Sequence, residues 1–175
     1  MSTQAHPSVT SIVMQPGAGE ALWFLGALAT VKASSEATAG RVTATEFLAP
    51  CGHGSPLHIR NDHDQSFYVL EGELTFWLDG EITAAPAGSY VYGPRGIPFR
   101  FTVSSEQARF LLVTEPGSFE EFMRALAEPA LEHAIPPAAT EPPDIARLSA
   151  AAADYGIEIL GPPVPATDDR KSVPS

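Results

Sequence analysis

The sequence is poor in cysteine and in basic residues. Cys51 is the single cysteine among 175 residues, which excludes an intrachain disulfide and any zinc site built from four thiolates. Ten Lys and Arg residues stand against 21 Asp and Glu residues, so the net charge is -11. Surfaces that bind nucleic acid or anionic membranes need clustered cations. We therefore expect neither nucleic acid nor a membrane surface as a partner.

Long apolar segments are lacking as well. The longest apolar run extends from Ala21 to Val31 and includes a glycine and a threonine. A membrane-spanning helix needs about 20 apolar residues, so this run is too short. The first residues also lack the basic and apolar regions of a secretory signal, and we expect a cytoplasmic protein. The composition, with 44% hydrophobic and 18% charged residues, favours one globular domain over a disordered chain.

The middle of the chain has the pattern of an all-β protein. Between Arg41 and Ser118, short runs rich in β-branched and aromatic residues alternate with turns at intervals of roughly 8–12 residues. Asp79-Gly80 between two of these runs predicts a tight hairpin. Residues 21–33 fit a further strand broken near Gly26, or alternatively a buried helix. The expected strands, which together favour a closed barrel or jelly roll, are residues 42–48, 57–60, 66–70, 73–78, 81–85, 90–92, 98–103 and 109–114.

A helical pattern follows Pro116-Gly117. Ser118 and Glu121 have the spacing of a capping box at a helix start. The next residues place one apolar face on that helix, made of Phe119, Phe122, Met123 and Leu126. Asp144 is expected to cap a second helix over Ile145–Tyr155, after a proline-rich linker. The predicted organisation is a leader (1–19), a β-barrel (20–117), a helical appendage that includes the linker (118–160) and a tail (161–175).

Two segments, residues 54–72 and 80–101, resemble the two sequence motifs of the cupin superfamily. In the first, a glycine at 52 or 54 precedes His58, and Gly72 closes the motif within the phrase FYVLEGEL, which begins at residue 67. The second contains Gly80, Pro86, Gly88 and the turn at 93–98. Within the superfamily the chain resembles small single-domain, quercetin-dioxygenase-like cupins. The resemblance implies an RmlC-like jelly-roll barrel with short C-terminal helices, and it implies a homodimer.

The resemblance also implies where a metal ion would bind. Metal-binding cupins typically hold the ion with three histidines and one glutamate. Here His58 keeps the first position, whereas Arg60, Gln65 and Phe99 occupy the other three. An arginine has no free lone pair and repels a cation, and phenylalanine offers no donor. We therefore expect no standard metal site and no metal cofactor; the alternative is a rearranged site of His58, His63 and Gln65 for a divalent Mn, Fe, Co, Ni or Zn ion.

The remaining polar residues of the motif predict acid–base chemistry. His58 and Arg60 are two positions apart on a strand and are expected on the same inward face. A histidine beside a cation stays neutral and can act as a general base, while Arg60 can stabilise an anionic oxygen. This pair favours an isomerase, cyclase or dehydratase acting on a carbonyl-bearing or phenolic aromatic substrate, as in secondary metabolism. The expected ligand-binding residues are Gln65, Phe67, Phe76, Tyr92, Phe99 and Phe101.

Two other functions fit the same residues. One is a metal-dependent oxygenase like quercetin 2,3-dioxygenase, which would need the rearranged site. The other is a non-catalytic protein that binds or senses a small apolar ligand. In that case Arg60 pairs with Glu71, Glu46 or an Asp of the adjacent turn, and His58 is an ordinary core histidine. Residues 61–64 have the composition of a turn whose side chains meet water, and His53 that of a loop histidine.

Overall fold

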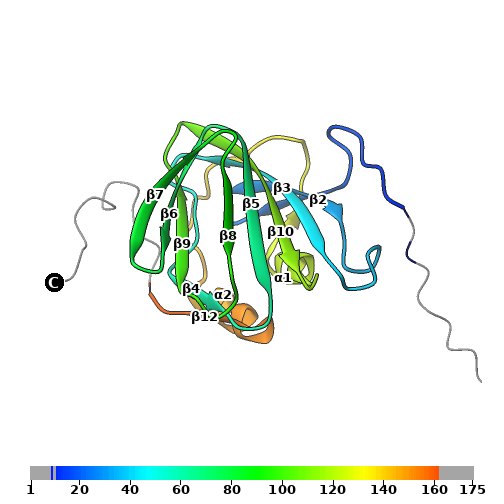
Figure 1. Cartoon of the computed structure of the whole chain (residues 1–175). Coiled ribbons are helices and arrows are strands. Elements are labelled where there is room, and N and C mark those ends of the chain that lie inside the picture. The colour runs from blue at the N-terminus through cyan, green and yellow to red at the C-terminus, as the bar shows by residue number, and fades with distance from the viewer. Residues whose placement is uncertain (1–8, 10, 162–175) are drawn as a thin grey trace, which may run out of the picture.

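The computed structural model describes residue 9 and residues 11–161. In this part of the chain the strands form two antiparallel sheets that face each other (Figure 1). The first sheet contains β1 (Glu20–Phe24), β2 (Ala27–Ala33), β3 (Thr43–Pro50), β5 (Asp64–Glu71), β8 (Tyr90–Gly93), β10 (Gln107–Glu115) and β11 (Glu128–Pro129). The second contains β4 (His58–Arg60), β6 (Glu73–Leu78), β7 (Glu81–Pro86), β9 (Phe99–Val103) and β12 (Ile157–Ile159). The predicted all-β jelly roll with short C-terminal helices is confirmed.

The strands are ordered β11-β1-β2-β3-β10-β5-β8 in the first sheet and β12-β4-β9-β6-β7 in the second. Two tight hairpins come from residues with positive φ. Leu25 and Gly26 have φ of 49° and 88° and join β1 to β2, so residues 21–33 form two strands and not a helix. Asp79 and Gly80, with φ of 48° and 87°, join β6 to β7 at the hairpin that the sequence predicts.

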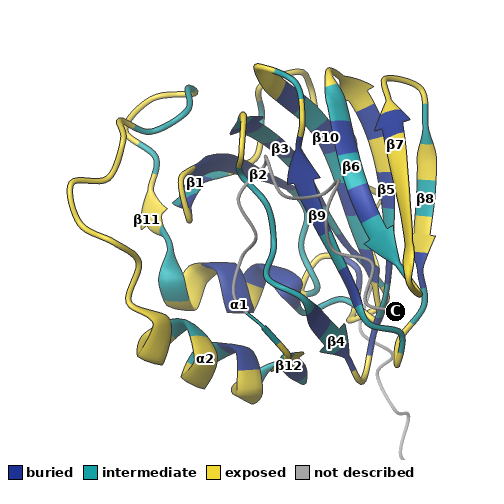
Figure 2. Cartoon of the chain, turned by 90° about the vertical axis from the view of Figure 1, so that its left-hand side faces the viewer, coloured by how far each residue is buried: buried dark blue, intermediate teal, exposed yellow. Residues whose placement is uncertain are grey.

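Buried residues alternate with less buried ones along β3 and β10, and Figure 2 colours the strands by this burial. The inward side chains of the strands build the interior. The pairing of β5, β10 and β3 places inward residues in successive rows across the first sheet. One row consists of Gln65, Thr114 and Thr43, the next of Phe67, Leu112 and Thr45, and the third of Val69, Phe110 and Phe47. Polar side chains therefore gather at one end of the interior, and aromatic side chains fill the middle.

Two helices follow the barrel strands. In α1 (Phe119–Leu126), the side chain of Ser118 makes no capping hydrogen bond, so the predicted capping box is wrong. The helix is held instead by Glu120, which is fully buried and accepts hydrogen bonds from the backbone N–H and hydroxyl of Ser35 and from the hydroxyl of Thr43. In α2 (Ile145–Asp154) the predicted cap is confirmed, because the Asp144 carboxylate accepts from the Arg147 N–H at 3.0 Å.

The proline-rich segment returns the chain to the barrel. It begins with β11, which pairs with β1, and it leads to α2, which lies beside α1 (Figure 2). After α2 the chain enters β12, where Ile157 pairs with Arg60 and Ile159 with His58. The C-terminal segment thus extends the second sheet next to the strand that carries the first cupin-like histidine. The expected tail, apart from Gly161, and part of the expected leader fall outside the described residues.

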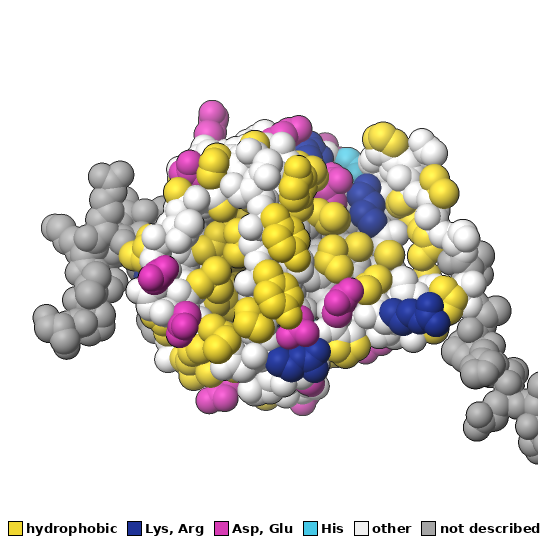
Figure 3. Space-filling model, viewed as in Figure 1, with side chains coloured by type: hydrophobic (Ala, Val, Ile, Leu, Met, Phe, Trp, Pro, Cys, Tyr) yellow, Lys and Arg dark blue, Asp and Glu magenta, His cyan; other side chains and the backbone are white. Residues whose placement is uncertain are grey.

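The outer face of β5 and β8 carries exposed apolar side chains. Tyr68, Leu70, Tyr90 and Tyr92 lie on this face, which Figure 3 shows as a hydrophobic area with charged residues around it. The homodimer expected from the resemblance stays a prediction. None of the helices in residues 9 and 11–161 is both long enough and apolar enough to span a membrane.

Candidate ligand-binding site

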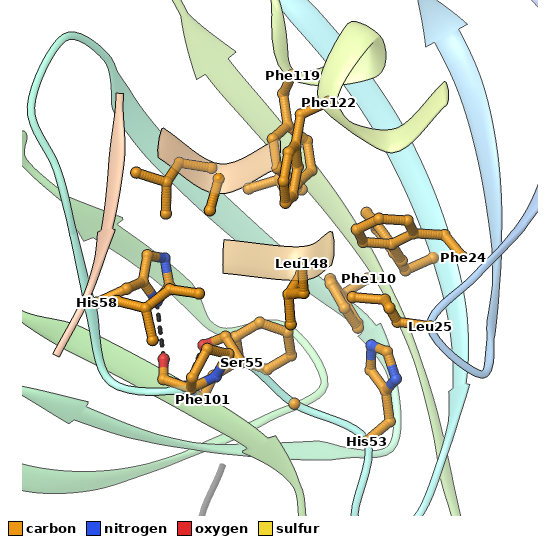
Figure 4. A pocket seen from close by; sticks show the side chains of 17 residues that line it. Phe24, Leu25, His53, Ser55, His58, Phe101, Phe110, Phe119, Phe122 and Leu148 are labelled. Carbon is orange, nitrogen blue, oxygen red and sulfur yellow. Dashed lines mark hydrogen bonds between the residues drawn. The ribbon is translucent and has the colours of Figure 1, made fainter. Parts of the chain in front are cut away.

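A cavity of about 80 Å³ lies between the barrel interior and the C-terminal segment (Figure 4). A single buried water needs roughly 10–15 Å³, so the cavity has room for a small organic molecule or a few waters. Its walls are mostly apolar and include the aromatic residues Phe24, Phe47, Phe101, Phe110, Phe119 and Phe122. Such a concave apolar site with few polar groups is typical of small-molecule binding.

The C-terminal segment closes one side of this cavity. Leu148 and Ala152 from α2 and Ile157 and Ile159 from β12 all line it. A second hollow of about 350 Å³ lies on the other side of α2 and shares Pro56, Leu148 and Ile159 with the cavity. These three residues therefore lie between the two spaces.

His58 supplies a polar group to the cavity wall. Its side chain is 3% exposed, and its Nδ1 lies 2.8 Å from the carbonyl oxygen of Pro56, as the dashed line in Figure 4 shows. A carbonyl only accepts, so Nδ1 donates and Nε2 keeps the lone pair of the neutral ring. No residue of the described chain forms a hydrogen bond to Nε2. The ring centroid of Phe99 lies 4.3 Å from that of His58 and fixes the imidazole from one side.

The surroundings keep His58 uncharged. Burial lowers the pKa of His58 to about 3, and the nearby charge of Arg60 lowers it further in the same direction. The imidazole is therefore neutral at physiological pH and can accept a hydrogen bond from a bound molecule. It is a weak base, because a general base works best with a pKa near the working pH.

His53 faces the same cavity from the loop between β3 and β4. The sequence predicts a loop histidine, and the structure adds that its ring is near that of Phe101, with centroids 6.3 Å apart. Burial lowers its pKa to about 4. The loop is held against β9 because the Val103 N–H donates to the His53 carbonyl at 2.7 Å. A Cβ at Gly54 would lie 2.1 Å from the Phe101 carbonyl oxygen, so this glycine was the available sequence signal for the close approach.

Arg60 does not line the cavity, although it shares the inward face of β4 with His58. Its Nη1 lies 2.6 Å from His63 Nε2, and its Cζ lies 4.5 Å from the ring centroid of Phe119. Burial lowers the pKa of Arg60 to about 9, which still leaves the side chain charged at pH 7. The expected alternative of pairing with Glu46 or Glu71 is wrong, because both carboxylates pair with Arg109.

The turn that follows β4 is less exposed than its composition suggests. His63 is 3% exposed and accepts a hydrogen bond from Arg60, while its Nδ1 lies 3.4 Å from the carboxylate of Asp62. The expectation that this side chain meets water is therefore wrong. Burial lowers the pKa of His63, and the adjacent Arg60 acts in the same direction. The buried cation needs an acceptor, and His63 provides one.

The side chains at the metal position do not fit a metal ion. Within residues 9 and 11–161, no three His, Cys, Asp or Glu side chains are grouped so that they could hold one. In the rearranged set, Nε2 of His63 is already the acceptor for Arg60, and the guanidinium places a positive charge where a cation would have to bind. Gln65 offers a buried Oε1, but a neutral amide oxygen is a weak ligand for these metals.

The other expected ligand-binding residues lie in three different places: at the cavity, elsewhere in the core, and on the outer surface. Phe101 lines the cavity, and Phe99 contacts the His58 ring. Gln65, Phe67 and Phe76 are buried but do not line it. Tyr92 is 51% exposed on the outer face of β8, because it alternates with the buried Gly93. Sequence reasoning missed the residues of α1, α2 and β12, whose apolar patterns indicate packing but not which space they enclose.

Comparisons with known proteins agree with this architecture. Residues 45–114 match the family model described as "Cupin domain". The chain is 27% identical over 134 residues to quercetin 2,3-dioxygenase of Bacillus subtilis (strain 168); the match covers 77% of this chain and 40% of that protein. An RmlC-like cupin from Shewanella frigidimarina superimposes with a TM-score of 0.54 at 17% identity, covering 65% of this chain and 99% of that one. KdgF from Halomonas sp. gives a TM-score of 0.50 at 18% identity, with coverages of 55% and 84%.

Proposed function

We propose that this chain, whose residues 45–114 match the family model for a cupin domain, binds a compact, mainly apolar small molecule in the cavity. The hydroxyl group of this molecule donates a hydrogen bond to Nε2 of His58. One observation carries the proposal: a neutral histidine, held by Pro56 through Nδ1, lies in a mainly apolar wall that also contains His53 and Ser55, with Nε2 unpaired among the described residues.

The chemistry of the cavity selects the ligand. Aromatic walls favour a flat apolar body, and the unpaired acceptor of His58 favours a ligand with a donor at its edge. A ligand without a donor would leave Nε2 buried and unpaired, which costs about 1–3 kcal/mol. Phenols and compact alcohols meet both requirements, and the expected phenolic aromatic substrate belongs to this class.

An acid–base enzyme is the second candidate. Its supporting observation is that the hydrogen bond to Pro56 orients the His58 ring, so Nε2 could take a proton from a bound hydroxyl. The pKa of about 3 argues for the weaker role of acceptor, because such an imidazole holds a proton poorly at neutral pH. Oxygenation of the quercetin-dioxygenase kind is not proposed, since the donor set does not fit a metal ion.

The test compares two isosteric probes, 4-methylphenol and p-xylene, by titration calorimetry. The native chain should bind the phenol about tenfold more tightly, because only the phenol pairs with Nε2. His58→Phe should remove this preference while p-xylene still binds, and His133→Phe on the exposed linker serves as the control. Failure of both probes to bind, or a preference that survives in His58→Phe, would refute the proposal. Conversion of a bound phenol to product by the native chain alone would favour the enzyme.

A further inference from the structure

The inner end of the barrel contains polar atoms that the fold leaves unpaired. Arg60 Nε, Gln65 Oε1, Thr45 Oγ1 and Thr114 Oγ1 are buried and have no hydrogen-bond partner within residues 9 and 11–161. Their residues are 6%, 2%, 0% and 1% exposed. Buried polar side chains are nearly always paired in native proteins, so such a group needs an explanation. We call these four residues the polar end of the barrel.

The register of the first sheet places the polar end next to the cavity. Leu112 lines the cavity, and Thr114 follows it on the same face, one strand step of roughly 7 Å farther along β10. Gln65 lies directly opposite Thr114, and Thr45 lies directly opposite Leu112. Neighbours across strands have Cβ atoms about 4.5–5.5 Å apart. Gln65 and Thr114 therefore form a polar pair beyond the apolar wall, and Thr45 lies one row nearer the cavity.

In the second sheet, too, two successive inward residues lead from the cavity to the polar end. His58 lines the cavity, and Arg60 follows it on the inward face of β4. The chain then turns at residues 61–63 and enters β5 near Gln65, so Arg60 points to the same end as Gln65. Phe119 lies at the boundary, because its ring lines the cavity and also contacts the Arg60 guanidinium.

The charge at this end is not neutralised by the described chain. Arg60 forms no ion pair with a carboxylate there, and the nearest acidic influence is Asp62, whose side chain is 65% exposed. The buried Glu120 is taken by Ser35 and Thr43. The other groups that contact Arg60, the His63 ring and the Phe119 ring, are neutral. A buried cation is normally paired with an anion, and no carboxylate within residues 9 and 11–161 forms an ion pair with Arg60.

We infer that the polar end receives the carboxylate of a ligand whose apolar body fills the cavity. Arg60 Nε and the two threonine hydroxyls donate to the carboxylate oxygens, and the Phe119 ring turns aside to admit them. The inference rests on the proposed function and narrows its ligand class from phenols to compact hydroxyaromatic acids. One end of such a molecule pairs with His58, and the other end reaches Arg60.

The test measures the affinities of the full chain for 3-(4-hydroxyphenyl)propionate and for its neutral amide. The acid should bind at least about tenfold more tightly, because hydrogen bonds to charged groups are the stronger kind. Arg60→Met should abolish this preference and leave amide binding intact. Arg109→Met, which removes a cation from the outer face, should leave the preference unchanged. An acid that binds no better than its amide, or a preference that survives in Arg60→Met, would overturn the inference.

The outcomes separate this inference from the proposed function. Binding of 4-methylphenol without any preference for the acid refutes the polar-end site alone, whereas absence of binding by all these probes removes both proposals. Should Arg60→Met not fold, Thr114→Val provides the same test with an isosteric change, and it should weaken acid binding several-fold. A crystal structure of the acid complex with ordered water alone at Arg60 and Thr114 would also contradict the inference.

Discussion

The two ends of the barrel interior differ in how their side chains are stabilised. In the middle and at the cavity, Phe47 and Phe110 stack with ring centroids 5.2 Å apart, and Phe101 meets Phe110 edge-on at 5.5 Å. At the polar end, buried donors and acceptors find no partner in the described part of the chain, and a buried cation finds no carboxylate there. The packed aromatic rings stabilise the fold, whereas unpaired polar groups in the interior destabilise it. The difference teaches that packing explains the aromatic region, whereas the polar end requires a partner from outside the chain.

Acid should have the largest effect, through the two histidines that line the cavity. His53 and His58, with pKa values of about 4 and 3, stay neutral in the folded chain, whereas unfolded histidine has a pKa of 6.5. Between these values the unfolded chain binds more protons, so the free energy of unfolding falls as the pH falls. From pH 7.5 to 4.5 the two histidines together should cost roughly 5 kcal/mol. Urea unfolding across this range measures the loss.

The chosen range lies above the titration of Asp64. Hydrogen bonds from Arg95 lower the pKa of Asp64 to about 2, and its contribution is lost only as the pH falls below its unfolded value of 3.8. His58→Gln should remove about half of the loss due to His53 and His58, and the exposed His133→Gln is the control. A free energy of unfolding that stays constant from pH 7.5 to 4.5 would contradict the burial of these rings.

Truncation in the aromatic region should have the next largest effect. Phe110 is fully buried and contacts the rings of Phe47, Phe67 and Phe101. Phe110→Ala should lower the free energy of unfolding by about 3–5 kcal/mol, since it removes apolar contacts and leaves a cavity. Tyr90→Ala, at a side chain that is 63% exposed, should change it by less than about 0.5 kcal/mol. Equal losses in the two variants would mean that the interior packing differs from the one described.

The sequence predicts the strands and their inward faces much better than the surroundings of the polar side chains. Alternating apolar residues and the Asp79-Gly80 turn indicate the strands, and the spacing of His58 and Arg60 predicts that both face inward. The spacing does not distinguish their surroundings, because the contacts come from residues far along the chain. Ile159 lies beside His58, and Phe119 covers Arg60. The buried position of His63 likewise depends on the hydrogen bond from Arg60, which a turn-like composition does not reveal.

The smallest expected change in the free energy of unfolding comes from a comparison of two threonines, Thr43 and Thr114, in the same row of the interior. The Thr43 hydroxyl donates to the buried carboxylate of Glu120, whereas the Thr114 hydroxyl has no partner within the described residues. Thr43→Val should therefore lower the free energy of unfolding by about 2 kcal/mol, the value of a hydrogen bond to a charged group. Thr114→Val should leave it unchanged or raise it by up to about 1 kcal/mol, because a methyl group replaces an unpaired hydroxyl.

Denaturant unfolding of the two valine variants under the same conditions decides between two explanations of the polar end. If Thr114→Val costs as much as Thr43→Val, the Thr114 hydroxyl belongs to a permanent network, such as one completed by buried water, and the polar end is structural. If Thr114→Val is neutral or stabilising in the free chain and yet weakens binding of the hydroxyaromatic acid, the hydroxyl contributes only when the ligand is present. A side chain that lowers stability in the free state and strengthens binding is expected of a functional site, where a local rule of stability is broken.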